Sequence, residues 1–509
     1  MGPRVRHAAA AREARLTRPL ALSPADLSAI QAEQGPVHMH VGGVLVFGGR
    51  VTAASIAERI DERIHLIPHY RMRLMASAPL GLSHPVWEDH PGFRAADHLR
   101  AVRWPEPGDD AALCRVVGEA MSVRLPRDRP LWELLVIDSP SRGVTAVLAR
   151  MHHALVDGIA AIGVGTIILD PTPEKLELPP PEGEPEERRL AWVRELRALM
   201  PDLGPDGATE LIEPLLRRSP ELEPPGRAEL RRLMTAQLDV PRRLAGGALS
   251  KGRDALDPRR AAKQARDAVG LMRDLARARP QAPDTRLNRG IGAERAFALA
   301  RGELATVKAI REAAGATVND VILTAVALML SEFLAPDVPD RTVALVPVSV
   351  RGDEHEGELG NRISTVFVDL PMRGEPLERL AAVSAVTRDL KDSAEVRTGA
   401  LIVGAAGLAP PAVSALTARA LGAPRLFNLV VSNVPGPQQT FYLDGVPLRE
   451  TFPAVPLNPR NQGLSIGVLS YDGSVNFGLL ADAGTVSDVA SAAESIERAL
   501  GDLAEAAGV

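Results

Sequence analysis

The chain has 509 residues, of which 45% are hydrophobic and 24% charged, and its formal net charge is −5. This length is too great for a single hydrophobic core and predicts two domains with a cleft between them. The composition is that of a soluble globular protein, and the low aromatic content of 3% argues against a base-stacking surface, so we expect no nucleic-acid binding.

The cysteine count and the N-terminus bear on the cellular setting. The single cysteine, Cys114, excludes an intrachain disulfide framework and a multi-cysteine zinc site. Residues 1–20 contain Arg and His but no apolar core of a secretory signal before Pro19, so we expect a flexible tail. Both observations fit a reducing, cytoplasmic location.

Residues 21–170 are predicted to form a first domain of mixed strands and helices. A helix begins at Ser23-Pro24, where a capping serine and a first-turn proline precede Leu27 and Ile30. Hydrophobic periodicity then predicts, in order, a strand at 37–47, helices at 54–66 and 111–125, strands at 132–137 and 144–151, and a helix at 159–169.

The octet Met151-His152-His153-Ala154-Leu155-Val156-Asp157-Gly158 follows the last of these strands. If the strand continues through the histidine pair, His152 and His153 point to opposite faces, so a metal site built on both is not expected. One imidazole delivered into a cleft is enough for a general base. The alternative is a purely structural role, as a polar strand end followed by an Asp-Gly turn. The octet alone favours neither interpretation.

Residues 171–289 are predicted to be a linker followed by a helical crossover. The stretch 171–225 contains Pro179-Pro180-Pro181 and an acidic run, which is linker composition. Residues 227–279 are rich in Ala, Leu and Arg, with an excess of positive charge. Solvated helical faces explain this excess, and attraction to anionic lipid head groups or to coenzyme phosphates is the alternative.

Residues 290–509 are predicted to form a second domain. Thr317 and Asp320 stand in capping-box positions before a helix that reaches residue 334. Strands are predicted at 343–350, 363–370 and 426–431, and a hairpin at 465–469 and 474–480 turns at Asp472-Gly473. The uncharged stretch 398–418, broken by Pro410-Pro411, predicts two short packed helices, with a membrane-dipping lip as the alternative. Strands and helices in both halves predict an α/β (α+β) fold.

Taken in order, the motifs of this chain resemble those of the bacterial wax ester synthase/acyl-CoA:diacylglycerol acyltransferases. HHxxxDG alone is shared with condensation domains and other chloramphenicol-acetyltransferase-like enzymes, whereas the ordered set is far more specific. Besides the octet, the matching pieces are Leu22-Ser23-Pro24, Met39-His40-Val41-Gly42-Gly43, Gly81-Leu82-Ser83-His84-Pro85-Val86-Trp87, Arg129-Pro130-Leu131-Trp132-Glu133, Thr317-Val318-Asn319-Asp320, Val346-Pro347-Val348-Ser349-Val350-Arg351, Leu359-Gly360-Asn361 and Ser432-Asn433-Val434-Pro435-Gly436-Pro437.

The resemblance implies two chloramphenicol-acetyltransferase-like domains that meet at an active-site tunnel. It implies an O-acyltransferase that moves a long-chain fatty acyl group from acyl-CoA to diacylglycerol or a long-chain alcohol, giving triacylglycerol or wax ester. It implies no metal and no bound cofactor, with acyl-CoA as co-substrate. It also implies peripheral association with the inner membrane face or with lipid inclusions. The oligomeric state is left open.

The resemblance assigns the general base to His153, within a catalytic motif that also includes His152, Asp157 and Gly158. Asp157 is expected to brace the loop rather than touch the imidazole, with Arg351 as the candidate ion-pair partner. The candidate substrate-binding residues are Asn319, Asp320, Pro130, Leu131, Trp132, Asn433 and Gly436.

Each of these candidates has a structural alternative. Asn319, our candidate oxyanion donor, and Asp320 also suit the start of a helix. The Pro130-Leu131-Trp132 segment also suits the start of a strand with a core aromatic residue. The segment from Asn433 to Gly436 contains residues that favour a turn whatever their other role, and Gly436 permits the close approach of a ligand.

Two rival functions stay open from the sequence. One is an acyltransferase of the same fold that serves a polyketide, peptide or glycolipid acceptor. The other is a noncatalytic lipid-binding or inclusion-coating protein. The span 171–289 is unusually rich in proline and charge, and the segment 287–292 matches the family pattern loosely, which leaves the acceptor and the docking to membranes less defined than the chemistry.

Overall fold

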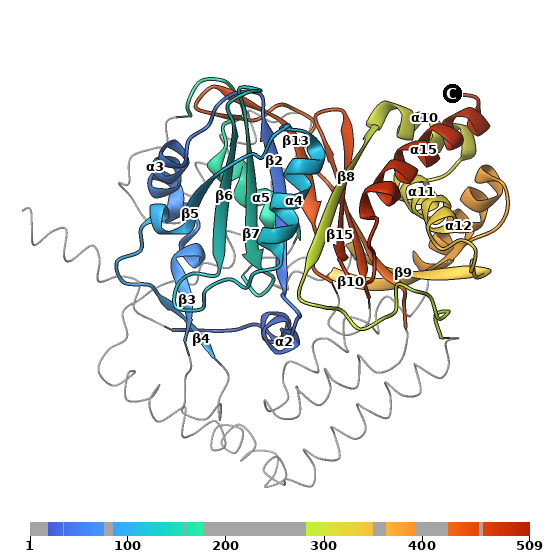
Figure 1. Ribbon diagram of the computed structural model, residues 1–509, viewed down its shortest axis with the longest axis horizontal. Helices are drawn as coiled ribbons and strands as arrows, with labels where there is room; N and C mark the ends of the chain where they lie inside the picture. The colour runs from blue at the N-terminus through green and yellow to red at the C-terminus, as the bar shows by residue number, and fades with distance from the viewer. Residues whose placement is uncertain are drawn as a thin grey trace, which may run out of the picture.

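The computed structural model describes residues 19–33, 35–75, 85–155, 158–176, 281–349, 363–391, 426–457 and 462–509. In this part of the chain two large β-sheets stand side by side, each accompanied by its own helices (Figure 1). A small third sheet lies below the first and joins β1, β4 and β3 (Leu20–Ala21, Val86–Asp89 and Met72–Met75).

The first large sheet has the described strand order β12-β13-β2-β7-β6-β5. Its central strands β2 and β7 pair antiparallel with His40 opposite His152 and Phe47 opposite Thr145. The strands of this sheet are β2 (His40–Phe47), β5 (Leu99–Arg103), β6 (Trp132–Ser139), β7 (Val144–His152), β12 (Tyr442–Leu443) and β13 (Val446–Ala454).

Local sequence explains where the helices of this half begin. Ser23 and Asp26 form a capping box at the start of α2, and Thr52 and Ser55 form one at the start of α3. Asp109 caps α4 through its side chain. The helical elements are α2 (Pro24–Ala32), α3 (Ala53–Arg63), η1 (Ile64–Leu66), η2 (Pro68–Arg71), η4 (Ala95–His98), α4 (Asp110–Met121) and α5 (Gly158–Ile168).

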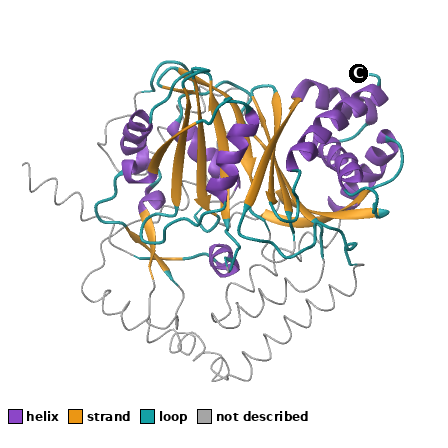
Figure 2. Cartoon of the chain, in the orientation of Figure 1, coloured by secondary structure: helices purple, strands orange, loops and turns teal. Residues whose placement is uncertain are grey.

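The second large sheet has the described order β10-β9-β11-β14-β15-β8. Four helices cover its outer face, as Figure 2 shows on the right of the view. The strands are β8 (Arg295–Glu303), β9 (Arg341–Ser349), β10 (Ile363–Pro371), β11 (Leu429–Pro435), β14 (Leu464–Tyr471) and β15 (Ser474–Asp482). The helices are α10 (Leu304–Ala314), α11 (Val318–Phe333), α12 (Pro376–Lys391) and α15 (Val489–Ala507).

The C-terminal half contributes a hairpin to the first sheet. Strand β13 pairs antiparallel with β2, from Leu448 opposite Phe47 to Ala454 opposite Gly42. This pairing was not predicted from the sequence, because β13 lies about 400 residues from β2 in the chain. The stretch 290–509 therefore contains strands of both sheets.

A shared core joins the two sheets through α4 and β8. The buried side chains of Leu113 and Val117 on α4 belong to one cluster with Phe297 of β8, Leu480 of β15 and Phe452 of β13. The backbone carbonyl of Arg295 comes so close to Gly118 that an added Cβ would lie 2.7 Å from it. This contact leaves no room for a side chain, so the helix and the strand meet backbone to backbone at Gly118.

Most predicted elements are confirmed within one to three residues, including the capping box at Thr317 and Asp320 and the turn at Asp472-Gly473, whose φ angles are both positive. The elements that were not predicted are strands β1, β3, β4, β5, β8, β12 and β13 and helices α10, α12 and α15. The stretch 398–418 lies outside the described residues, as do most of 171–289. Within the described chain no single helix has the length and composition of a membrane span; α10 and α11 pass that test only as a pair bent by 100°.

Candidate active site

Strand β7 delivers the histidine pair and ends at His152. The two residues before the turn point to opposite faces of the sheet, since Met151 lines an apolar cavity while the ring of His152 lies near the carboxylate of Glu33. The prediction for His152 and His153 required the strand to continue through both residues, and this condition is not met because β7 ends at His152. His153 is the first residue of the turn and is half-buried.

Backbone hydrogen bonds fix the turn on both sides of His153. The N–H of His153 donates to the carbonyl of Met39 at 2.7 Å, and the N–H of His152 donates to the carbonyl of Leu131 at 2.9 Å. The N–H of Leu155 donates back to the carbonyl of His152 at 2.8 Å. The turn is therefore tied to the residue before β2 on one side and to the residue before β6 on the other.

The ring of His152 takes part in the same turn. Its Nδ1 accepts a hydrogen bond from the N–H of Ala154 at 3.0 Å, and its Nε2 lies 3.8 Å from Oε2 of Glu33. Glu33 follows the last residue of α2, and its side chain is almost fully buried. Burial alone would raise the pKa of Glu33, but His152 and Arg127 outweigh it and hold that pKa far below its usual range.

A second imidazole faces the same carboxylate. Nε2 of His40 lies 3.6 Å from Oε1 of Glu33 and accepts the N–H of Leu125 at 3.3 Å. Burial lowers the pKa of His40 well below its ordinary value, and the nearby Arg150 acts in the same direction. His40 therefore stands as a neutral ring opposite His152.

An apolar cavity of about 240 Å³ lies on the Met151 face of the first sheet. It is bordered by that sheet face, by α3 and α5, and by β11 and β14 of the other half. Its lining includes Val41, Gly43, Leu45 and Phe47 on β2, Val147, Ala149 and Met151 on β7, Ile56, Ile60 and Ile64 on α3, Val164, Gly165, Ile168 and Leu169 on α5, and Val434, Val468, Leu469 and Tyr471 from the second half.

The predicted segment Pro130-Leu131-Trp132 borders both the turn and the cavity. Leu131 supplies the carbonyl that holds His152, and Trp132 lines the cavity. The indole N–H of Trp132 donates to the carbonyl of Tyr70 at 2.8 Å, and its ring stacks on His98 at 4.2 Å between centroids. All three side chains are buried, so the segment supports the site from within the core.

The structure also brings together two of the predicted residues from the second half. Nδ2 of Asn433, on β11, donates to Oδ1 of Asn319, on the first turn of α11, at 3.4 Å. The carboxylate of Asp320 instead accepts hydrogen bonds that hold α11 in place. It accepts the N–H of Thr317 at 2.9 Å, which caps the helix, and the hydroxyls of Ser384 and Thr387 on α12.

Gly436 has a structural reason for lacking a side chain. A Cβ there would lie 2.4 Å from the carbonyl oxygen of Ser470 on β14. The group that comes close to this glycine is therefore the backbone of the neighbouring strand β14. Of the other predicted residues, Gly158 begins α5, and Asp157 and Arg351 lie outside the described residues.

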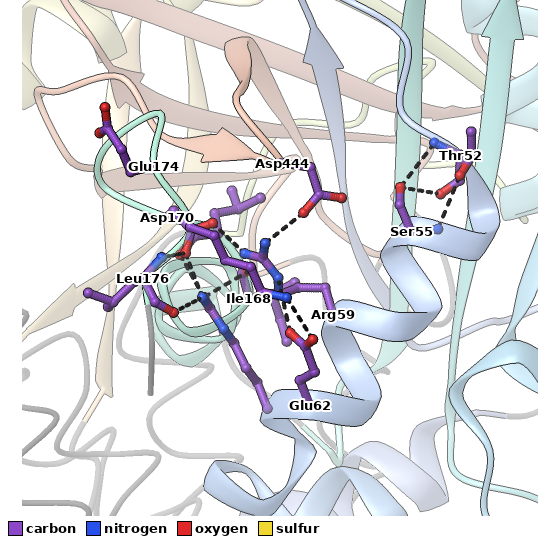
Figure 3. Close-up of polar contacts among 12 residues, drawn as sticks. Thr52, Ser55, Arg59, Glu62, Ile168, Asp170, Glu174, Leu176 and Asp444 are labelled. Carbon is purple, nitrogen blue, oxygen red and sulfur yellow. Dashed lines mark hydrogen bonds and ion pairs between the residues drawn. The ribbon is translucent and has the colours of Figure 1, made fainter. Parts of the chain in front are cut away.

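A buried ion cluster at the far end of α5, drawn in Figure 3, was not predicted from the sequence. Asp170 accepts hydrogen bonds from Arg59 and, at 2.5 Å, from Arg63, and Arg59 also reaches Asp444 of the β12–β13 turn at 2.7 Å. The sequence did contain an indication of this cluster. Arg59 and Arg63 lie on the same face of the helix as Ile56 and Ile60, so their side chains are expected to be buried.

Two further observations limit the chemistry. Burial raises the pKa of Cys114 to about 12, so its thiol is no nucleophile at neutral pH. Within the described ranges no group of three or more His, Cys, Asp or Glu side chains is arranged to hold a metal ion.

Comparison with known proteins gives consistent results. The sequence profile of the wax ester synthase/diacylglycerol acyltransferase catalytic domain matches residues 22–322, and that of the WS/DGAT C-terminal domain matches residues 359–504. A Mycobacterium tuberculosis protein named "probable diacylglycerol O-acyltransferase" is 27% identical over 94% of this chain and 97% of its own length. A second protein of that organism, which carries the enzyme name as a provisional assignment, is 28% identical over 90% of this chain and 84% of its own length.

Solved structures show the same fold. The wax ester synthase/diacylglycerol acyltransferase from Marinobacter aquaeolei VT8 is similar with a TM-score of 0.64 and 23% identity, over 96% of this chain and 100% of that one. The first condensation domain of the calcium-dependent antibiotic synthetase is similar with a TM-score of 0.53 and 16% identity, over 97% of both chains. At these identities the likeness concerns the fold alone, and it confirms the predicted chloramphenicol-acetyltransferase-like architecture.

Proposed function

The chain belongs to the wax ester synthase/diacylglycerol acyltransferase family and is an acyltransferase, and we propose that it joins a long-chain fatty acyl group from acyl-CoA to the hydroxyl of diacylglycerol or a long-chain alcohol. The products are triacylglycerol or wax ester. The proposal requires one base, one apolar binding space beside it, and a site that holds the two substrates together.

The observation that carries the proposal is the apolar cavity next to the HHxxxDG strand. It begins at Val41 and Met151, beside the turn of His153, and follows β2 as far as Phe47. Six residue steps along a strand span roughly 20 Å, which matches an extended long acyl chain. Burying such a chain is favourable at about 0.8 kcal/mol per methylene, so the cavity favours a fatty substrate over a polar one.

His153 is proposed as the general base. Its neutral imidazole accepts the proton of the acceptor hydroxyl as that oxygen attacks the thioester carbonyl, and the imidazolium then gives the proton to the departing coenzyme A sulfur. No acyl-enzyme forms in this scheme, in keeping with the inert thiol of Cys114. Acyl-CoA acts as co-substrate and no cofactor takes part.

Asn319 remains the proposed donor to the oxyanion of the tetrahedral intermediate. Its Oδ1 accepts from Asn433, which orients the amide so that its NH₂ group is left to donate elsewhere. Preorganised donors of this kind are each worth about 3 kcal/mol in a dry site. Asp157 is proposed to brace the turn through Arg351.

We propose in addition that the protein works at the inner membrane face or at lipid inclusions. Its acceptors, diacylglycerol and long-chain alcohols, reside in such phases. The excess of arginine and lysine in residues 227–279 supports attraction to anionic head groups.

The test is thiol release from palmitoyl-CoA by purified protein, with dioleoylglycerol, hexadecanol and polar alcohols offered side by side. We expect release with the two lipid acceptors. His153→Ala should lower turnover by about 100-fold or more, because the base is lost, while the melting temperature stays nearly unchanged. His65→Ala, at an exposed histidine, serves as the matched control and should keep its activity.

Two results would contradict the proposal. Full turnover by His153→Ala would remove the assigned base. Saturable lipid binding by the wild-type protein without thiol release, whatever the acceptor, would favour the noncatalytic alternative.

A further inference from the structure

The ring of His152 has one tautomer that suits both of its neighbours. A backbone N–H can only donate, so the bond from Ala154 requires Nδ1 of His152 to carry no proton. A neutral ring then carries its proton on Nε2, the atom that faces Glu33 at 3.8 Å. Within the described chain this buried Nε2 has no partner at hydrogen-bond distance, so the carboxylate is the acceptor toward which it points.

Glu33 holds two strands of the site at once. Its Oε2 faces the His152 ring and accepts Arg127 at 2.5 Å, while its Oε1 accepts the N–H of Met39 at 3.4 Å. The carbonyl of Met39 in turn receives the N–H of His153 at 2.7 Å. One buried carboxylate therefore acts on the turn through the His152 ring and through the backbone of Met39.

Other charged or titratable groups surround this carboxylate. His40 lies 3.6 Å from it on β2, His38 lies within its electrostatic reach, and Arg150 lies near His40. Arg127 is half-exposed and reaches in from the loop after α4. Removing Arg127 therefore changes the charge beside Glu33 without touching the His152 contact.

We propose that Glu33 is a positioning residue for the reaction, acting through His152. Its carboxylate selects the Nε2–H tautomer of His152, which leaves Nδ1 free to accept the N–H of Ala154 and so fixes the peptide group that follows His153. The peptide group that precedes His153 is held by the carbonyl of Met39, whose own N–H donates to Glu33. The proposal rests on the proposed function only for its kinetic tests. The tautomer of His152 can be measured without any substrate.

The kinetic test compares Glu33→Gln with Arg127→Gln. Glutamine keeps the size of the side chain but removes the charge that selects the tautomer. We expect kcat to fall roughly 10- to 100-fold, as for other groups that orient a reacting side chain, with KM for acyl-CoA nearly unchanged because Glu33 is absent from the residues that line the cavity. Arg127→Gln should lower kcat much less than Glu33→Gln does, since it leaves the buried carboxylate in place beside His152 and removes only a half-exposed side chain.

A double-mutant cycle separates positioning from general support of the fold. His152→Asn places an amide oxygen near the position of Nδ1, where it can accept Ala154, and leaves nothing for Glu33 to select. Glu33→Gln should therefore cost little further kcat in the His152→Asn background. An equal loss in both backgrounds would show that Glu33 supports the fold only and would overturn the proposal.

The tautomer itself is read by NMR of ¹⁵N-histidine-labelled protein, with the His152 signals assigned by their loss in His152→Asn. We expect a protonated Nε2 in the wild type and a mixture of tautomers in Glu33→Gln. A protonated Nδ1 in the wild type, or an unchanged ring in Glu33→Gln, would overturn the proposal. A wild-type protein that releases no thiol would defeat the proposed function and still leave this measurement decisive.

Discussion

Single residues decide how much room the cavity offers. On the cavity face Gly43 of β2 pairs with Ala149 of β7, and the next pairs on either side are the larger Val41 with Met151 and Leu45 with Val147. An added Cβ at Gly43 would meet only the carbonyl of Phe452, at 3.9 Å. The small pair therefore leaves the middle of the sheet face open for a chain.

Gly43→Leu should fill this gap and shorten the acyl chain that the enzyme accepts. We expect kcat/KM for palmitoyl-CoA to fall by about tenfold or more, while a four-carbon acyl-CoA is used nearly as before. Gly43→Ala is the graded control, because its Cβ fits without contact closer than 3.9 Å. Equal losses for long and short chains would argue that the acyl chain lies elsewhere. Thiol release across a series of acyl-CoA chain lengths measures the effect.

At the scale of elements, helix α5 connects the reactive turn to the ion cluster. It begins at Gly158, the last residue of the HHxxxDG motif, and at its other end Arg63 donates to the carbonyl of Ile167 at 2.9 Å and to that of Leu169 at 3.2 Å. A guanidinium at this position satisfies the last carbonyls and complements the helix dipole. The helix that follows His153 is therefore anchored at its C-terminus by α3.

Asp170→Asn tests this anchor. The change removes the negative charge between two buried guanidiniums, so we expect the free energy of unfolding to fall by about 3–5 kcal/mol. Asp444→Asn is the matched control: Asp444 is half-exposed with a φ of 50°, a conformation that asparagine tolerates, and its loss should cost about 1 kcal/mol or less. Denaturant unfolding curves measure both. Equal stability of the two variants would show that the cluster contributes nothing specific.

At the scale of the whole molecule, the two sheets depend on each other. Strand β13 forms the neighbour of β2, and Arg301 of β8 links Glu450 of β13 at 2.5 Å and Asp110 of α4 at 2.8 Å. Without β13 the hydrogen-bonding edge of β2 would be exposed, along with one wall of the cavity. We therefore expect that the two halves of the sequence do not fold independently.

A fragment ending at residue 289 tests this dependence. It contains β2, β5, β6 and β7 but lacks β13, so we expect it to aggregate or to unfold without a cooperative transition. Co-expression with residues 290–509 should restore a soluble complex that elutes as one species in gel filtration. A monomeric fragment that melts cooperatively by itself would contradict the interdependence.

Sequence patterns were sufficient for most of the local structure. Capping residues located the starts of α2 and α11, and hydrophobic alternation located strands such as β6 and β7. These features depend on residues close together in the chain, so they can be predicted without the tertiary structure. The ordered motifs likewise indicated the family, which the comparisons confirm.

Tertiary structure alone decided the contacts between distant segments. Neither Glu33 beside His152 nor Asp170 between Arg59 and Arg63 follows from local spacing, because about 110 to 120 residues of chain separate the partners. The pairing of β13 with β2 is of the same kind. Periodicity shows that a side chain or a strand edge must be covered, but it does not show by what. That depends on which distant surfaces match in shape and charge once the chain has folded.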